Sequence, residues 1–496
     1  MTDNTPHENM PTGIPQEMRP YPIKYPVITD YNVFKMSNRG KASLNPYELM
    51  RYLEDSWVVY YGTTPYQFNG YVYGLLSETD IEQMLYRVVN TTAMRFPSQD
   101  DIPIMTKSFL EDLIRQYSNT HSVADLPDPP EGAEILAPYE SELGLVAFKN
   151  GILNMDTLEL LPFTPFIFVN MQIQAMYNPT LKEHPVEQVY KNILPDDATR
   201  ETFYRLAGYT IYSETLRIPG IFILYGGGET GKTSLQMVLT TLMSEYSYSA
   251  LAMADFADKF APAELEGKRA NFCGEADNRS SKETKIAGSM LKDISEAGKK
   301  ILVRRIYHKP MHMLPSAKLW FCTNCMPDFG DRSSGMLRRL YIFPCRVKQN
   351  WDDQIRDKLL DPEALDWFAN KIFDAYLQFL ADGCKVPISE DMNEEVAHFA
   401  LQDPLNEFLL EEFNQFNDRS KLIRLIEGCS TVELYAKYEA YCRARYIHPM
   451  RHHDFLEYFR NEFNLHSEGK KYRTPEGKGT TMAVFRLRKK SGENDA

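Results

Sequence analysis

The chain has 496 residues, enough for about three domains of ordinary size. Its hydrophobic share of 43% and aromatic share of 12% exclude a largely disordered chain. The net charge of −13 at pH 7 argues against a protein that binds nucleic acid over its whole surface.

The sequence contains no apolar run near the roughly 18 residues that a membrane-spanning helix needs. Its polar, proline-rich beginning lacks the basic-then-apolar layout of a secretory signal. The seven cysteines have no framework spacing, which is typical of reduced thiols. We therefore expect a cytoplasmic protein that has no membrane partner.

In chain order, residues 1–130 predict a mainly helical region that begins with a flexible tail. An aromatic, strand-like insert, WVVYYGTTPYQFNGYVYG, interrupts the helical pattern. The proline-rich, acidic stretch DLPDPPEGAE (125–134) predicts the first domain boundary. A separate primase or polymerase is a candidate partner of residues 1–130.

Residues 131–200 predict an adaptor domain, with short extended pieces in LGLVAFKNGILNMDTLELLPF before a helical stretch. Residues 201–350 alternate strands with helices, which indicates an α/β core with a parallel sheet. The expected strands are IFILY (221–225), RANFCGE (269–275), ILVRRIY (301–307) and AKLWFCTN (317–324).

Residues 351–394 predict a helical connector. Residues 395–496 read as a helix near DPLNEFLLEEFNQF, two short helices, and a basic β-like pair, KKYRTPEGKGTTMAVFRLRK. Helices followed by a basic hairpin are typical of a winged-helix DNA-binding domain. Local charge agrees with selective binding, because residues 451–490 hold 10 Lys and Arg against 5 Asp and Glu, and residues 268–310 hold 11 against 5. Such strips are equally often ordinary solvated faces.

The motif G-x-x-x-x-G-K-[ST] follows an apolar strand and opens a helix, the context in which it binds nucleotide phosphates. Glycines let backbone N–H groups surround phosphates, the lysine reaches the β- and γ-phosphates, and the threonine can ligate Mg²⁺. The sequence therefore predicts a site for ATP and Mg²⁺ formed by Gly226, Gly227, Gly228, Glu229, Thr230, Gly231, Lys232, Thr233 and Ser234.

Polar residues at the ends of later strands predict how the nucleotide is hydrolysed. Glu275 ends one expected strand and is our candidate for orienting or deprotonating water. Gly274 stands where a Mg²⁺-ligating Asp is usual, so Asp277 becomes a possible additional metal ligand. Asn324 ends another strand and can hold the attacking water or sense the γ-phosphate.

A pair of arginines, Arg338 and Arg339, precedes the apolar segment LYIFP. A ring ATPase needs an arginine supplied across a subunit boundary, worth about 10³–10⁵ in rate in related phosphoryl transfers. Either member of the pair fits this role, and either could instead form a surface salt bridge.

Taken together, GGGETGKTS, LEGKRANFCGEAD, KDISEAGKKILVRRIYHKPMHMLPSAKLWFCTN and RRLYIFP resemble superfamily 3 helicases. More narrowly, the chain is similar to the phage/plasmid and poxvirus-type primase-helicase C-terminal family. The resemblance covers about 140–490 and is most specific over 226–345. It implies an AAA+ core that forms a hexameric ring, hydrolyses ATP between subunits and translocates on single-stranded or forked DNA.

The resemblance also implies residue roles. Lys232 is the P-loop lysine, Glu275 the Walker B acid, Asn324 the sensor, and Arg339 or Arg338 the arginine finger. A hairpin that projects into the ring pore would be formed by ILVRRIY and MHML, with its tip near His308 and Lys309. Its cationic side chains would track DNA phosphates without reading bases. The expected contacts are Lys299, Lys300, Arg304, Arg305, His308 and Lys309.

One segment departs from the family. A Gly-Gly-Asp usually follows the Lys-x-Leu-Thr element, whereas this chain has Glu296-Ala-Gly298 after Lys292-Asp-Ile-Ser. No acid pair with a partner histidine stands out in residues 1–140, so we expect no primase activity.

We expect an ATP-driven replicative DNA helicase of a phage, plasmid or other mobile element. The alternative is a nucleotide-gated DNA-binding initiator or loader without processive unwinding. A small-molecule P-loop kinase is disfavoured, because nothing resembles an acceptor-binding lid. Translocation polarity, DNA or RNA preference and exact ring size stay open.

Overall fold

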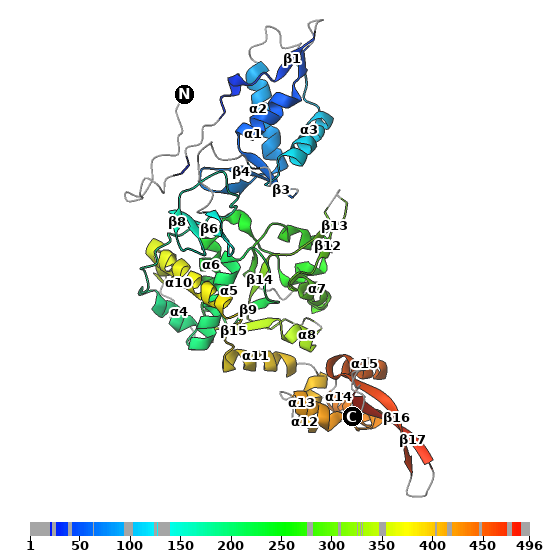
Figure 1. The fold of residues 1–496 in the computed structure, drawn as a ribbon. Helices are drawn as coiled ribbons and strands as arrows, with labels where there is room; N and C mark the ends of the chain where they lie inside the picture. Colours follow the sequence, from blue (N-terminus) through cyan, green and yellow to red (C-terminus); the bar gives the residue numbers. More distant parts are fainter. Residues whose placement is uncertain are drawn as a thin grey trace, which may run out of the picture.

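The protein is described by a computed structural model in which the chain forms three consecutive parts (Figure 1). An N-terminal part, a central part built on a sheet, and a C-terminal part follow one another along the molecule. The structure describes residues 20–21, 26–37, 42–62, 64–93, 103–123, 126, 139–274, 281–305, 309–324, 326–327, 329, 331–346, 354–401, 404–413, 419–445, 449–473 and 479–487. Among them, no helix is both long and apolar enough to cross a membrane.

The described residues of the central part form a five-stranded sheet in which all neighbours are parallel, as the alternating pattern predicts. Its order is β10-β11-β14-β9-β15. The strands are β9 (Ile221–Tyr225), β10 (Tyr248–Ser249), β11 (Ala270–Cys273), β14 (Lys318–Thr323) and β15 (Leu340–Pro344). They are continuous apolar runs because both faces of a parallel sheet are covered.

Alternate residues of each strand enter two separate hydrophobic cores, one on each face of the sheet. On β9, Phe222 and Leu224 join one core, whereas Ile221 and Ile223 join the other. The first core is closed by α4 (Glu187–Ile193), α5 (Asp197–Tyr212), α6 (Lys232–Leu242), α9 (Gln354–Leu360) and α10 (Pro362–Ala381). The second is closed by η7 (Met253–Ala257), η8 (Ala261–Leu265), α7 (Ser281–Ile294), α8 (Ser334–Leu337) and α11 (Glu390–Leu401).

Two helical stretches that look continuous in the sequence are broken in the structure by helix caps. The Asp361 side chain accepts hydrogen bonds from the N–H groups of Glu363 and Ala364, and Pro362 follows it at the first helical position. These features start α10 anew after α9. In the same way, the Asp196 side chain accepts from the N–H of Thr199 at 2.6 Å and starts α5 after α4.

The N-terminal part has two hydrophobic clusters of its own. Its elements are η2 (Ile28–Asp30), β1 (Phe34–Met36), β2 (Ala42–Leu44), α1 (Pro46–Asp55), β3 (Val58–Tyr61), β4 (Thr64–Phe68), β5 (Tyr73–Leu75), α2 (Glu78–Ala93) and α3 (Lys107–Thr120). The next strands, β6 (Leu145–Phe148), β7 (Gly151–Asn154) and β8 (Leu160–Leu161), form a small antiparallel sheet. The Tyr73 N–H donates to the Val169 carbonyl at 2.8 Å and links the two parts.

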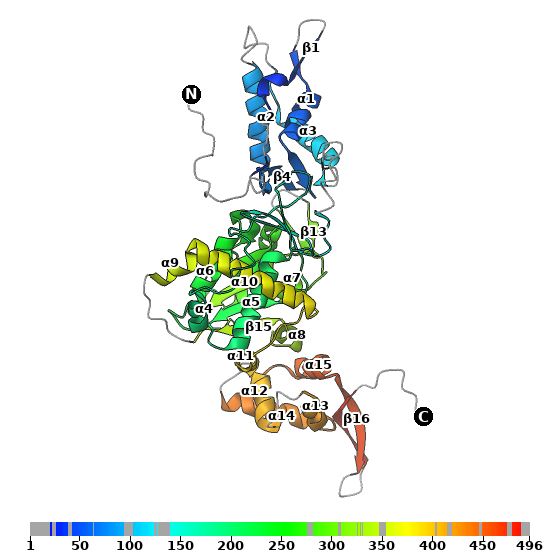
Figure 2. The same cartoon turned by 60° about the vertical axis from the view of Figure 1, so that its left-hand side comes forward.

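The C-terminal part also has a separate core. It contains α12 (Pro404–Phe413), α13 (Arg419–Ile426), α14 (Thr431–Ala444), α15 (His452–Phe463), β16 (Leu465–Arg473) and β17 (Gly479–Leu487). Helix α13 was not expected from the sequence. Strands β16 and β17 form a long antiparallel hairpin that extends away from the helices in both views (Figures 1 and 2).

Candidate functional site

The glycine-rich loop lies at the carboxyl edge of the sheet, between the end of β9 and the start of α6. Three of its residues have left-handed backbone: Gly226 with φ +155°, Glu229 with φ +63° and Gly231 with φ +90°. Gly227, Gly228 and Glu229 are exposed at the tip of the loop. The local chain therefore turns sharply before the first turn of α6, whose N–H groups lack intrahelical acceptors.

Close packing explains two of the glycines. A Cβ on Gly226 would strike the carbonyl oxygen of Cys345, which directly follows β15. A Cβ on Gly231 would lie only 2.7 Å from Cγ1 of Ile193, the last residue of α4. The loop is thus seated on α4 and β15, whereas Gly227 and Gly228 have open space in front of them.

Lys232 is buried, and its amine is held by the loop itself. Its Nζ donates to the carbonyl oxygens of Gly226 at 2.8 Å and Gly227 at 2.5 Å. The Thr230 hydroxyl also donates to the Gly227 carbonyl, at 3.0 Å. Phosphate oxygens could replace these carbonyl acceptors without the lysine leaving the loop, so the cradle fits a nucleotide polyphosphate. The neighbouring Thr233 is exposed, as a Mg²⁺ ligand needs to be, and Ser234 is buried.

Asn324 lies beside this loop. Because β14 pairs with β9 so that Thr323 is opposite Tyr225, the residues that follow, Asn324 and Gly226, emerge together at the carboxyl edge. The Gly226 N–H donates to the Thr323 carbonyl at 3.2 Å, and Asn324 itself is exposed. Glu275 and Asp277 lie outside the described residues, so their predicted roles stay predictions. The strand before them, β11, ends at Cys273 on the same edge.

The two arginines lie at the opposite, amino edge of the sheet. Strand β15 starts with Leu340 opposite Ile221, and the Ile221 N–H donates to the Arg339 carbonyl at 2.7 Å. One strand length of five residues, about 17 Å, separates this edge from the glycine loop. The arginines therefore cannot reach the loop of their own chain.

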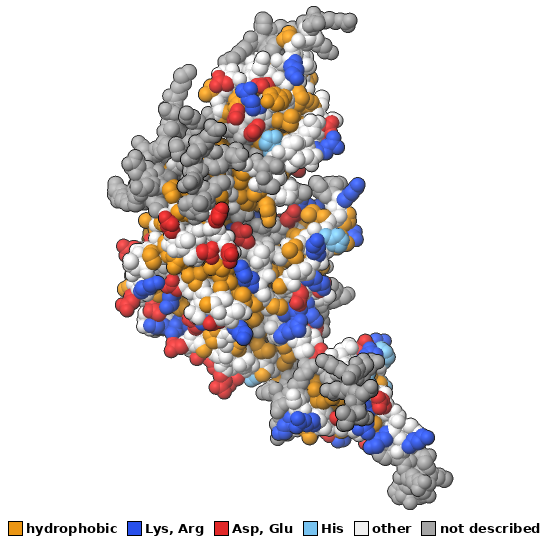
Figure 3. Space-filling model, in the orientation of Figure 1, with side chains coloured by type: hydrophobic (Ala, Val, Ile, Leu, Met, Phe, Trp, Pro, Cys, Tyr) orange, Lys and Arg blue, Asp and Glu red, His pale blue; other side chains and the backbone are white. Residues whose placement is uncertain are grey.

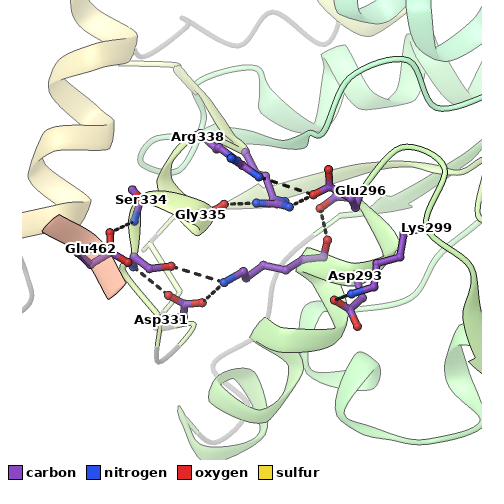
Figure 4. Close-up of polar contacts among 12 residues, drawn as sticks. Asp293, Glu296, Lys299, Asp331, Ser334, Gly335, Arg338 and Glu462 are labelled. Carbon is purple, nitrogen blue, oxygen red and sulfur yellow. Dashed lines mark hydrogen bonds and ion pairs between the residues drawn. The ribbon is translucent and has the colours of Figure 1, made fainter. Parts of the chain in front are cut away.

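Arg338 and Arg339 differ sharply in environment, which the sequence alone could not decide. The side chain of Arg339 is only 6% exposed, pairs with the Glu296 carboxylate, and donates to the Gly335 carbonyl. That of Arg338 is 65% exposed and reaches the same carboxylate only at 3.9 Å (Figure 4). Arg339 therefore anchors the chain, and Arg338 is the member available to another molecule.

Strands β12 (Ile301–Val303) and β13 (Met311–Met313) form the antiparallel hairpin that the resemblance implied, but shorter than expected. Arg304 is exposed, whereas Arg305 pairs with Glu266 on the body of the core. Of the other predicted DNA contacts, Lys299 pairs with Asp293 at 2.5 Å, Lys300 and Lys309 are exposed, and His308 lies outside the described residues. Figure 3 shows basic and histidine side chains gathered over this hairpin.

Sequence reasoning missed a buried group of cations at the amino edge. The guanidinium of Arg269 donates to the Ile211 carbonyl at 3.2 Å and to Glu214 at 2.6 Å, and the Lys318 amine donates to the Ser213 carbonyl. Both carbonyls end helix α5, whose negative dipole end favours cations. Burial lowers the pKa of Lys318 well below its usual value, and the charge of Arg269 lowers it further.

A model of a protein family of unknown function, DUF5906, matches residues 224–339, from the end of β9 to Arg339. No curated protein matches the chain. Similar solved structures include three of the NrS-1 C-terminal region without ligand. One is 15% identical with a TM-score of 0.47 and covers 88% of this chain and 98% of that chain. Two A forms are 14% and 16% identical, with TM-scores of 0.40 and 0.37; they cover 65% and 63% of this chain, and 80% and 77% of those chains.

Proposed function

We propose that the protein is an ATP-dependent DNA helicase of superfamily 3 that hydrolyses ATP between subunits of a ring, which we take to be a hexamer. One subunit would offer the loop 226–234 and Asn324, and its neighbour would offer Arg338. In this role Glu275 would act on the attacking water. Mg²⁺ would be held by Thr233, with Asp277 as a further candidate ligand, and would neutralise charge on the phosphates.

The observation that carries the proposal is the separation of the two catalytic elements within one chain. The glycine loop lies at the carboxyl edge of the sheet and the exposed Arg338 near the amino edge, a strand length away. A head-to-tail contact between copies brings opposite edges together, and repeated contacts of this kind form a ring when the rotation closes.

The β12–β13 hairpin supports a nucleic-acid substrate. It carries exposed cations, including Lys300, Arg304 and Lys309, on a body whose net charge is −13. Cations in this arrangement bind phosphates at one place and leave the rest of the surface repulsive. We further propose that α12–α15 and the β16–β17 hairpin act as a winged-helix DNA-binding domain, since Lys470 and Lys471 are exposed on that hairpin.

The test measures ATP turnover and strand displacement on forked DNA, with a Lys232→Ala variant as the reference. We expect the unaltered protein to release a strand catalytically and the variant to do neither. A variant that unwinds forked DNA normally contradicts the proposal. ATP turnover and DNA binding without strand release would favour an initiator or loader of the same mobile elements.

A further inference from the structure

Glu296 occupies the segment that departs from the family pattern, two residues after the end of α7. One oxygen of its carboxylate, Oε2, pairs with the buried guanidinium of Arg339 and also lies 3.9 Å from that of Arg338, which Figure 4 labels. The Glu296 side chain is 33% exposed, so the carboxylate that pairs with the buried Arg339 lies partly at the surface. The residue that departs from the motif thus pairs with both arginines, closely with Arg339 and at longer range with Arg338.

The segment that carries Arg338 is held in place from several directions. Arg339 donates to the Gly335 carbonyl, which fixes α8 to the Glu296 pair. The Lys292 amine contacts Asp331 at 2.7 Å, and the Ser334 N–H donates to the Glu462 carboxylate of α15 at 2.9 Å. Burial alone would raise the pKa of Asp331, but hydrogen bonds from Lys292 and Ser333 outweigh it and lower the pKa. The backbone around Arg338 is therefore well defined, and only its side chain is loosely held.

A loosely held arginine side chain loses rotamer entropy when it binds a phosphate. A weak ion pair reduces this loss because it restricts the guanidinium beforehand. At a mostly exposed position such a pair contributes little stability, so a triphosphate can displace it. The 3.9 Å contact between Arg338 and Glu296 meets both conditions.

We propose that Glu296 is a positioning residue, which directs Arg338 toward the nucleotide of the adjacent subunit while Arg339 holds Glu296 in place. The inference rests on the proposed function, because it needs Arg338 to complete a neighbouring site. Glu296 would not touch the nucleotide. Its loss would slow the chemical step, in which the arginine stabilises charge, and would leave the binding of ATP unchanged.

The experiment is a double-mutant cycle of ATP turnover without DNA, with kcat and KM measured for Arg338→Ala, Glu296→Gln and the double variant. We expect Glu296→Gln to lower kcat about tenfold at unchanged KM. The double variant should be no slower than Arg338→Ala alone, because Glu296 acts only through Arg338. Asp293→Asn is the matched control: it removes one carboxylate three residues away, one that pairs with Lys299, and should keep kcat within about twofold.

The outcomes separate this inference from the proposed function. If Arg338→Ala keeps full turnover while Lys232→Ala has none, the shared arginine is wrong and Glu296 has nothing to position. If Arg338→Ala is slow and Glu296→Gln is normal, only the positioning role is overturned. The role is also overturned if the double variant is slower than Arg338→Ala by the full Glu296→Gln factor.

Because Glu296 also pairs with the buried Arg339, Glu296→Gln could be unfolded at the assay temperature. In that case Glu296→Asp replaces Glu296→Gln in the same double-mutant cycle, since its shorter side chain keeps the charge but moves it away from Arg338. We expect a kcat lowered about threefold, and no further loss in the Arg338→Ala background. An unchanged kcat for Glu296→Asp in that case contradicts the proposal.

Discussion

Each edge of the central sheet holds a buried lysine, and the two lysines differ in the groups that accept their hydrogen bonds. At the carboxyl edge, Lys232 donates to carbonyls of an exposed glycine loop. At the amino edge, Lys318 donates to the carbonyl that ends α5 and lies over the Tyr209 ring, 5.1 Å from its centroid. Phosphate oxygens can replace the loop carbonyls that accept from Lys232, whereas the carbonyl that accepts from Lys318 is part of the fold.

The difference teaches that a buried cation is not by itself evidence of a binding site. Burial makes both amines costly unless they are hydrogen-bonded. What distinguishes Lys232 is the open space in front of Gly227 and Gly228, where a ligand can enter. Substituting Lys232 should therefore lower ATP turnover, whereas substituting Lys318 should lower stability.

The largest expected effect is the loss of ATP turnover in Lys232→Ala. Lys318→Met is the comparison at the amino edge, where the effect should fall on stability. Lys232→Ala should lower ATP turnover about a thousandfold, because no other described cation lies on the phosphate loop. Its free energy of unfolding should change by about 1 kcal/mol or less, since solvent can satisfy the loop carbonyls. Phosphate release and thermal melting measure the two quantities. Normal turnover by Lys232→Ala would remove the distinction between the edges.

Arg338 and Arg339 sharpen the comparison within one edge. Arg338→Ala should lower kcat about a hundredfold or more with an unchanged melting temperature, because its side chain is largely exposed. Arg339→Ala should destabilise the fold by about 3 kcal/mol, since it breaks a buried ion pair. Steady-state kinetics and chemical denaturation distinguish the two. The assignment is reversed if Arg339→Ala is stable but slow and Arg338→Ala has normal turnover.

A smaller effect is expected from Gly231→Ala. Its φ of +90° disfavours any side chain by about 1–2 kcal/mol, and the added Cβ would press on Ile193. Gly228→Ala is the matched control for stability, because its Cβ would meet open space. Chemical denaturation should show the loss only for Gly231→Ala. Equal stability of the two variants would mean that the loop is not seated on α4.

Measured per pH unit, the smallest effect is a change of stability with pH at the amino edge. The pKa of Lys318 is lowered in the folded state, so the unfolded chain binds more protons between that lowered pKa and about 10.5. The stability that Lys318 contributes should therefore rise with pH across this window, by at most about 1.4 kcal/mol per unit. The unfolding free energies of the unaltered protein and Lys318→Met, compared from pH 7 to 10, measure it. A constant difference between them would show that the amine titrates normally.

Local patterns predicted the parts of the fold that local physics determines. The apolar run 221–225, the glycine loop and the following helix all appear as expected, because strand, turn and helix signals are adjacent in the chain. The short β12–β13 hairpin was implied by the family resemblance and not by a local pattern, and Arg305 leaves the strand to pair with Glu266.

Contacts between distant segments could not be predicted. Nothing near Arg338 or Arg339 in the sequence reveals which of the two pairs closely with Glu296, because Glu296 lies more than forty residues away in the chain. The same holds for the Ser334–Glu462 contact and for the cations held by the end of α5. A weak signal existed only for Lys318, a charged residue at the start of an otherwise apolar strand.

The central claim is that two subunits build one catalytic site, and mixing two inactive variants tests it most directly. Lys232→Ala subunits keep Arg338, and Arg338→Ala subunits keep the glycine loop. In randomly mixed rings about a quarter of the interfaces would join an intact loop to an intact arginine. ATP turnover of the mixture should rise toward that fraction of the unaltered protein, and mixing either variant with the double variant should restore nothing. A mixture no more active than its two components measured separately would contradict the account.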